Sequence, residues 1–241
     1  MNKSLSSRIV LSTSALIFVV VGVLAVSFLL LLEQKIAIIE EGKAAAAENA
    51  FFVALDAKAR EAQAAAESLA ANDDVRRALA ARDRDAALKL LSPSFEMLKK
   101  NAGFSQMHFI DADMRSFLRV MLPEKHGDDL SSSRPMLAQA NAGRTRARGL
   151  EGGVVGLAVR GMVPVTAPDG RYLGILEAGS FLTDASLQTL PRTGVEFEVL
   201  AAENGGFSRL AASSPDVPQI DAAAAGRAMA GERFLAWREG R

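Results

Sequence analysis

The feature that most restricts this 241-residue sequence is a stretch of 24 residues without a charged side chain, from residue 9 to residue 32. As an α-helix it would be about 36 Å long, which exceeds the roughly 30 Å hydrocarbon core of a bilayer. A cleaved signal peptide is the alternative, but its apolar region usually has only about 7–15 residues before a small-residue cleavage site. Here Phe28 and four leucines lead directly to Glu33, so we interpret residues 9–32 as an uncleaved transmembrane helix.

The charges on the two sides of this span predict its orientation. Lys3 and Arg8 precede it, whereas a mixed-charge segment starting at Glu33 follows it. Because cytoplasmic flanks carry the excess of Lys and Arg, residues 1–8 are expected in the cytoplasm. The chain is therefore predicted to cross the inner (cell) membrane once, with everything from about residue 33 onward in the periplasm.

The composition argues against several classes of function. The chain has 28 Lys and Arg against 28 Asp and Glu, so no basic surplus is available to neutralise phosphates, and we expect no nucleic acid partner. It has no cysteine, which excludes disulfides, thiolate catalysis and Cys-ligated zinc. With 49% hydrophobic residues, the chain is expected to bury one or two small cores.

An alanine-rich segment after the span predicts a long stalk helix that continues the membrane helix outward. From residue 33 to about residue 71 there is no proline and one glycine, and half of residues 44–71 are alanine. A narrow apolar stripe on this helix fits docking on its own domain and a parallel dimer seam equally well. A homodimer through this helix is the assembly we expect. The stripe consists of Ile36, Ile39, Ala46, Ala50, Val53 and Ala57.

Two shorter helices are expected between the stalk and the first strands. Asn72 is placed to cap the first of them, and Asp83 or Asp85 is placed to cap the second. Pro93 is expected to kink the second helix or to restart it. Gly103 is expected to end it, because glycine adopts the left-handed conformation found at helix C-termini.

Beyond Gly103 the hydrophobic pattern changes to the alternation that is typical of strands. Two hairpins separated by a short helix predict an α+β fold, with an antiparallel sheet and the long helix across one face. The expected elements are strands at 104–111 and 115–122, a helix at 131–142 with Pro135 in its first turn and Gly143 after its end, a basic connector at 144–153, and strands at 154–166 and 171–181.

Near Gly194 the pattern begins again with two strands, an alanine-rich helix at about 220–230 and the apolar segment FLAW at 234–237. We interpret this as the start of a second, smaller module, and expect the chain to be the N-terminal fragment of a longer receptor. The predicted domains are a cytoplasmic N-terminus (1–8), a transmembrane helix (9–32), a stalk with short helices (33–103), a membrane-distal module (104–190) and an incomplete membrane-proximal module (191–241).

Three segments resemble the membrane-distal module of double Cache sensory domains, which occur in bacterial chemoreceptors, sensor histidine kinases and diguanylate cyclases. They are FLRVMLPEKHGDDLSSSRPMLAQAN (117–141), GLEGGVVGLAVRGMVPV (149–165) and DGRYLGILEAG (169–179). The resemblance covers roughly residues 34–241. It implies a long N-terminal helix beside two PAS-like modules, with a small molecule between the distal sheet and its lid loops. Any enzymatic output domain would lie beyond the C-terminus, so we do not expect this chain to be an enzyme.

The charge distribution indicates what kind of ligand to expect. Residues 115–160 hold eight Lys and Arg and four acids, a local net charge of +4 in a neutral chain. A concave site there would attract anions, and the planar fork of arginine suits a carboxylate. The predicted ligand is therefore a small organic anion.

Three arginines are the main candidates for binding it. Arg119 and Arg160 lie in strands among apolar neighbours, where an unpaired charge would be costly. Each must meet a ligand or an acid, and the alternative for Arg119 is an internal ion pair with Asp128, Asp129 or Glu177. Arg134 lies beside a helix N-terminus, which favours anions, or it is simply solvent-exposed.

For each remaining candidate, a structural role is the alternative to ligand binding. His108 would donate to a bound carboxylate or carbonyl, or it is a hydrogen-bonded structural residue. Asp128 and Asp129 cap the following helix, or they order the lid and accept from an amino group. The full predicted ligand-binding set is Arg119, Arg134, Arg160, His108, Asp129 and Glu177.

No metal, cofactor or catalytic group is predicted. His108 and His126 are the only histidines, and no spacing of acids supports a metal site. Gly152, Gly153 and Gly156 lack the context of a nucleotide loop, and neither G-x-S-x-G nor H-E-x-x-H occurs. The competing hypotheses are a membrane-anchored scaffold that binds a partner protein and, less favoured, a periplasmic enzyme.

Overall fold

A computed structural model of the chain describes residues 5–153, 156–189, 195–203, 206–215, 217 and 220–230. These residues fall into two units, one up to Glu48 and one that starts at Asn49. The first helix, α1 (Leu5–Ala70), contributes residues to both units.

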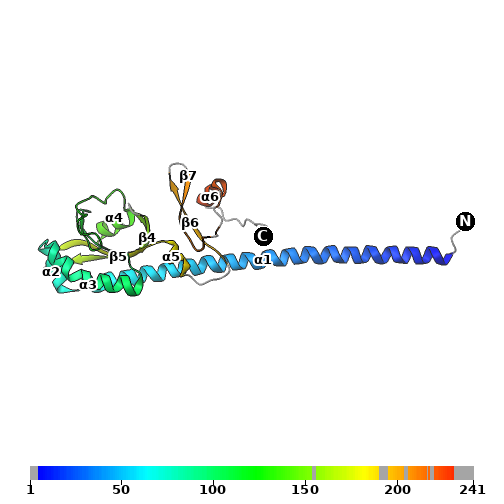
Figure 1. Cartoon of the computed structure of the whole chain (residues 1–241), viewed down its shortest axis with the longest axis horizontal. Coiled ribbons are helices and arrows are strands. Elements are labelled where there is room, and N and C mark those ends of the chain that lie inside the picture. Colours follow the sequence, from blue (N-terminus) through cyan, green and yellow to red (C-terminus); the bar gives the residue numbers. More distant parts are fainter. Residues whose placement is uncertain are drawn as a thin grey trace. The chain divides into compact units, whose positions relative to one another are not determined.

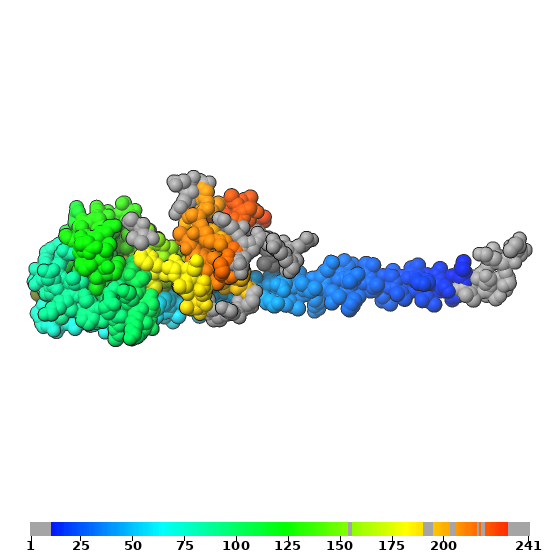
Figure 2. All heavy atoms as spheres, viewed as in Figure 1, coloured from blue at the N-terminus to red at the C-terminus, as the bar shows by residue number. Residues whose placement is uncertain are grey.

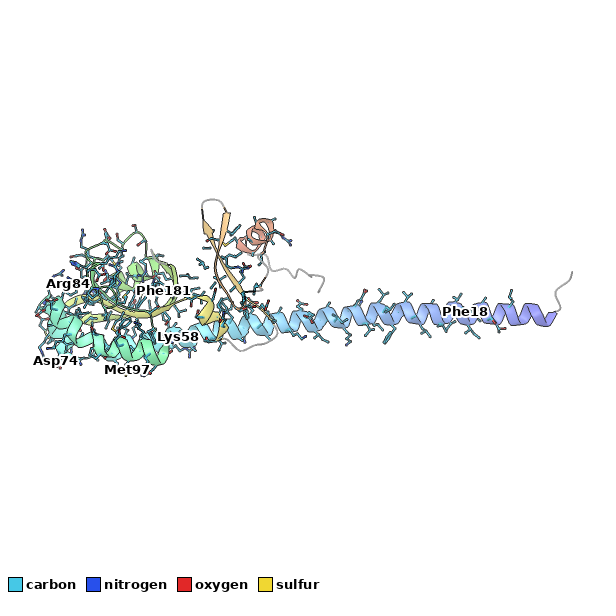
Figure 3. The ribbon with its side chains drawn as sticks, viewed as in Figure 1. Phe18, Lys58, Asp74, Arg84, Met97 and Phe181 are labelled. Atoms are coloured by element: carbon cyan, nitrogen blue, oxygen red, sulfur yellow. The ribbon has the colours of Figure 1, made fainter. Side chains whose placement is uncertain are left out.

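In the first unit, α1 carries the uncharged span. Its large apolar side chains between residues 11 and 32 are exposed, from 41% at Leu32 to 79% at Phe18. Figure 2 shows them as the blue spheres, and Figure 3 labels Phe18. Within the described ranges, α1 is the helix whose length and composition suit a membrane span. Exposure of this apolar surface to water is unfavourable, and a bilayer would cover it.

The second unit is built on a five-stranded antiparallel sheet with the strand order β2-β1-β5-β4-β3. Hairpin β1–β2 precedes helix α4, and hairpins β3–β4 and β4–β5 follow it. Strands β2 and β3 are therefore the edges. The bounds are β1 Gln106–Asp111, β2 Ser116–Arg119, β3 Ala147–Gly153, β4 Gly156–Thr166 and β5 Tyr172–Phe181.

One face of the sheet is covered by helices that precede it in the chain. These are the later turns of α1, α2 (Asp73–Ala80) and α3 (Arg84–Ala102), visible beside the sheet in Figure 1. Small residues let α1 come close: a Cβ on Gly161 of β4 would lie 2.0 Å from the backbone N of Gln63. The core on this face includes Ala62, Ala66, Leu91, Phe95, Met107, Phe109, Val163, Leu176 and Ala178.

The opposite face is covered by one short helix, α4 (Pro135–Gly143), which lies over β4 and β5 in Figure 1. Its apolar core is small. The buried residues are Ile110, Met114, Leu130, Leu137, Ala140, Met162 and Ile175. The rest of this face is covered by polar side chains, and this is what distinguishes the two faces.

A second, two-stranded sheet follows the first. It pairs β6 (Glu198–Glu203) with β7 (Gly206–Ala212), and it is flanked by α5 (Asp184–Gln188) and α6 (Ala222–Met229). Phe197, just before β6, stacks on Phe51 of α1 with ring centroids 5.5 Å apart. The predicted FLAW segment lies outside the described residues.

The predicted α+β class is confirmed, and so are several local features. Asn72 accepts from the backbone N–H groups of Asp74 and Val75, Asp83 accepts from Ala86, and Gly103 ends α3 in the left-handed conformation. Each of these signals is local, because a cap needs only the residues one turn away.

Other expectations about the elements were wrong. The segment 144–153 is not a connector, because residues 147–153 pair along β4 as strand β3. Of the two outcomes expected at Pro93, a kink or a restart, the restart does not occur, because α3 runs through Pro93 as one helix. Helix α4 begins at Pro135 rather than at residue 131, and Arg144 (φ 50°), not Gly143, adopts the left-handed conformation at its end. Neither Asp128 nor Asp129 caps it, since Asp129 accepts from Ser131 in the preceding turn.

Candidate ligand-binding site

A buried polar cluster lies between the sheet and α4. Strand alternation brings its first members to one face, because His108 of β1 pairs with Glu177 of β5, while Gln106 of β1 and Arg160 of β4 both pair with Gly179. Gly179 carries no side chain, and a Cβ there would lie 2.6 Å from the carbonyl oxygen of Val159 and 3.4 Å from Cγ of Arg160. The glycine therefore allows the close approach of the β4 backbone and of the Arg160 side chain.

Glu177 is the centre of the cluster and is completely buried. Its Oε2 accepts from Nη2 of Arg134 at 2.5 Å, and its Oε1 accepts from Nη1 of Arg160 at 2.7 Å. Nη1 of Arg160 also donates to Oε1 of Gln106 at 2.5 Å. Two arginines thus share one carboxylate in a region without solvent.

A second carboxylate, Glu151 of β3, completes the cluster. Its Oε2 accepts from Nε of Arg134 at 2.6 Å, and its Oε1 accepts from the backbone N–H groups of Met136 at 2.7 Å and Leu137 at 3.2 Å. These N–H groups belong to the first turn of α4 and would otherwise lack an intrahelical acceptor. Glu151 therefore caps α4 from a strand, and its charge is favourable at the positive end of the helix dipole.

Burial and neighbouring charges determine which groups are ionised. Burial alone would raise the pKa of Glu177, but the charges of Arg160 and Arg134 outweigh burial and lower this pKa to about 2. Burial lowers the pKa of His108 to about 3, and Arg119 and Arg134 act in the same direction. The cluster therefore contains two arginines, an ionised Glu177 and a neutral histidine, whose Nε2 lies 2.8 Å from Oγ of Ser116.

Two hydrogen-bond donors of this cluster lack an acceptor within the described residues. Among the described residues, Nε of Arg160 and Nε2 of Gln106 are buried without a hydrogen-bond partner. Oε2 of Glu151 lies 3.8 Å from Nε of Arg160, beyond hydrogen-bond range. Unsatisfied buried donors are costly, so the site would gain from an additional acceptor.

A family of bacterial sensory domains matches most of the chain. The family model described as "Double sensory domain of two-component sensor kinase" covers residues 41–227. The chain belongs to this double Cache family. The predicted resemblance is thereby confirmed, and among curated proteins none matches the chain.

One solved sensor domain shares the fold. The sensor domain of the Vibrio cholerae histidine kinase DctB aligns over 81% of this chain and 76% of its own length, with a TM-score of 0.53 and 12% identity. The Escherichia coli DcuS sensor domain aligns over 53% of this chain and 90% of its own, with a TM-score of 0.38 and 17% identity. The periplasmic domain of Vibrio cholerae LuxQ aligns over 69% and 77%, with a TM-score of 0.44 and 16% identity.

Four of the six predicted binding residues of this double Cache chain meet in the cluster: Arg134, Arg160, His108 and Glu177. The other two do not. Arg119 forms two 2.7 Å bonds with Asp128, one to each carboxylate oxygen, and also donates to the carbonyl of Lys125. This is the internal ion pair that was the alternative for Arg119. The hydrogen bonds from Arg119, with a further contribution from its charge, lower the pKa of Asp128 to about 2.

Sequence reasoning missed two members, Glu151 and Gln106. Glu151 was overlooked because its segment was interpreted as a connector, and a residue in a connector has no assigned face. Strand alternation would have placed Glu151 inward once β3 was paired with β4, where Glu151 lies opposite Ala158. Gln106 gave no signal beyond sharing a strand face with His108.

A cavity of about 810 Å³ lies elsewhere, on the face of the sheet that carries α1. Apolar residues dominate its lining, and none of the six predicted binding residues contributes to it. Its charged members, Lys58 and Glu61, pair with each other at 2.8 Å. In the cluster, by contrast, Arg134, Arg160 and Glu177 are at most 4% exposed, so that site is closed.

Proposed function

We propose that this chain is the extracytoplasmic ligand-sensing region of a bacterial transmembrane receptor, and that a small organic anion binds at Arg134 and Arg160. The observation that carries the proposal is the buried Arg160, which is charged and 2% exposed and whose Nε has no acceptor among the described residues. A ligand carboxylate would supply that acceptor and form charge-assisted bonds. Membership of a family of sensory domains supports ligand sensing at this face.

The proposal includes a route for the signal. Gly161 follows Arg160 on β4 and points to the opposite face, where the backbone of Ala62 and Gln63 in α1 lies against it. A change at Arg160 would therefore reach α1 through one strand. Transmission requires that the ligand has different affinities for two arrangements of the sheet and α1.

The membrane arrangement is part of the same proposal. Lys3 and Arg8 support an N-terminus in the cytoplasm, so that α1 would carry the change into an inner membrane. The exposed Ile36, Ile39 and Val53 on α1, which are 54–60% accessible, support a homodimer through this helix.

A thermal-shift screen of the detergent-solubilised full chain tests the proposal. The panel contains monocarboxylates, dicarboxylates and amino acids at fixed ionic strength. A ligand present at about 100 times its Kd stabilises the folded state by about 2.7 kcal/mol, which corresponds to a rise in Tm of several degrees. We expect at least one carboxylate to produce this rise.

Arginine variants locate the site. Arg160→Met and Arg134→Met are expected to abolish the shift, because each removes a guanidinium from the cluster. Arg119→Met is the matched control, since Arg119 pairs with Asp128 outside the cluster. The proposal fails if no compound shifts Tm, or if the shift persists in Arg160→Met.

A further inference from the structure

Edge strand β3 directs a charged side chain into the protein. Of its seven residues only Glu151 is buried, while its neighbour Leu150 is 42% exposed. A buried glutamate with an exposed leucine reverses the usual preference of these side chains. The strand therefore directs the Glu151 carboxylate inward, and the contacts of this carboxylate indicate its function.

The Glu151 carboxylate occupies what is chemically an anion-binding site. Two N–H groups at the start of the nine-residue helix α4 and Nε of Arg134 donate to it. Nε of Arg160, which has no partner within the described part of the chain, lies 3.8 Å from Oε2 of Glu151. Helix N-termini and arginines are the usual donors for carboxylates from any source. Nothing in this donor set requires that the carboxylate belong to the protein.

We propose that Glu151 is an internal stand-in for the ligand, and that the ligand carboxylate takes its place between α4, Arg134 and Arg160. This inference rests on the proposed function and specifies how binding occurs there. The ligand enters by exchange, so the side chain of Glu151 leaves the site as the ligand arrives.

Charge balance favours exchange over addition. The closed cluster pairs Arg134 and Arg160 with Glu151 and Glu177, so its formal charges cancel. A ligand carboxylate added to this set would leave one buried negative charge without a partner, which is strongly unfavourable. Replacing Glu151 keeps the balance and offers Nε of Arg160 a new acceptor.

The structure also shows why β3 can release Glu151. The strand has one neighbour, β4, and Gly149, Gly152 and Gly153 surround the glutamate with a deformable backbone. Gly153 lies next to the guanidinium of Arg160, since a Cβ added to Gly153 would be 2.9 Å from Nη2.

The same strand is connected to α1. Nε of Arg148 lies 3.2 Å from Oδ1 of Asp56, and Nη1 of Arg148 donates to Gln63 at 3.2 Å. Arg146 pairs with Glu67 one turn further along α1. Release of Glu151 would thus alter the polar contacts between this segment and α1. Ligand exchange would therefore change the contacts of α1 directly.

Chemical rescue of Glu151→Ala tests the exchange. The variant leaves the anion site without a carboxylate, and acetate is the probe that can refill it. In the full chain in detergent, we expect acetate at tens of millimolar to raise the Tm of Glu151→Ala by several degrees and to saturate. The wild type should shift by less than one degree, with chloride at equal ionic strength as the reference.

The double variant Glu151→Ala, Arg160→Met is the matched control, and its Tm should not respond to acetate. Equal acetate shifts in wild type and Glu151→Ala, or no shift in Glu151→Ala, would overturn the inference. Should Glu151→Ala fail to fold, Glu151→Gln serves instead, because its amide oxygen still accepts from α4. We then expect panel ligands to bind Glu151→Gln about tenfold more tightly than wild type.

Loss of ligand binding in Glu151→Gln, as in Arg160→Met, would contradict exchange and make Glu151 a positioning residue. The two proposals can fail separately. A panel without any ligand would overturn the proposed function, while acetate rescue of Glu151→Ala would still support a replaceable carboxylate. A ligand that depends on Arg160, with no acetate rescue, would keep the proposed function and reject the exchange.

Discussion

At the scale of single residues, burial makes His108 a determinant of acid sensitivity. Its pKa is lowered to about 3 from 6.5, mainly by burial. Between these pH values the unfolded chain binds a proton at His108 that the folded chain does not. The free energy of unfolding is therefore expected to fall by about 1.4 kcal/mol per unit as the pH drops from about 6 to 5.

Urea unfolding of the full chain in detergent at several pH values measures this slope. His108→Gln should lose most of it, and the same change at the exposed His126 is the matched control, which should keep it. Glu177, whose pKa is lowered to about 2 from 4.5, loses its contribution only below about pH 4.5, so the two effects are separable. An unchanged slope in His108→Gln would contradict the prediction.

At the scale of elements, the contact between β4 and α1 depends on a missing side chain. A Cβ on Gly161 would lie 2.0 Å from N and 2.4 Å from Cα of Gln63, so Gly161→Ala must push α1 away from the sheet. We expect a loss of about 2 kcal/mol or more in the free energy of unfolding, as for other overpacked cores. Faster hydrogen exchange in α1 around Gln63 should accompany it.

The matched control is Gly152→Ala in the neighbouring strand β3, where no atom lies within 4 Å of the added Cβ. Its effect should stay within about 0.5 kcal/mol. If both variants unfold with the same free energy, α1 does not depend on close approach at Gly161, and the proposed route from Arg160 to α1 loses its main contact.

At the scale of the whole molecule, the orientation across the membrane can be read with single cysteines, because the chain has none of its own. Asp74, labelled in Figure 3, is exposed at the start of α2. A membrane-impermeant maleimide should label Asp74→Cys in spheroplasts. Ser4→Cys should be labelled only after the membrane is permeabilised, and the reverse pattern would reject the proposed topology.

Much of the fold could be predicted because its signals are local. The uncharged span, the caps at Asn72 and Asp83 and the stop at Gly103 each depend on a few adjacent residues. Edge strand β3 could not be predicted, because its pairing with β4 compensates for a sequence of glycines and charges that has little strand character of its own.

The candidate site, like the fold, could be predicted only in part from the sequence. The sequence by itself determined which residues carry charge and that Arg119 and Arg160 needed partners, because an apolar setting makes a lone charge unfavourable. Only the tertiary structure decided which residues those partners are, and that Arg134 is buried rather than exposed. Arg134 meets Glu151 and Glu177, which are 17 and 43 residues away, and contacts at that separation depend on which strands pair and which face each side chain takes.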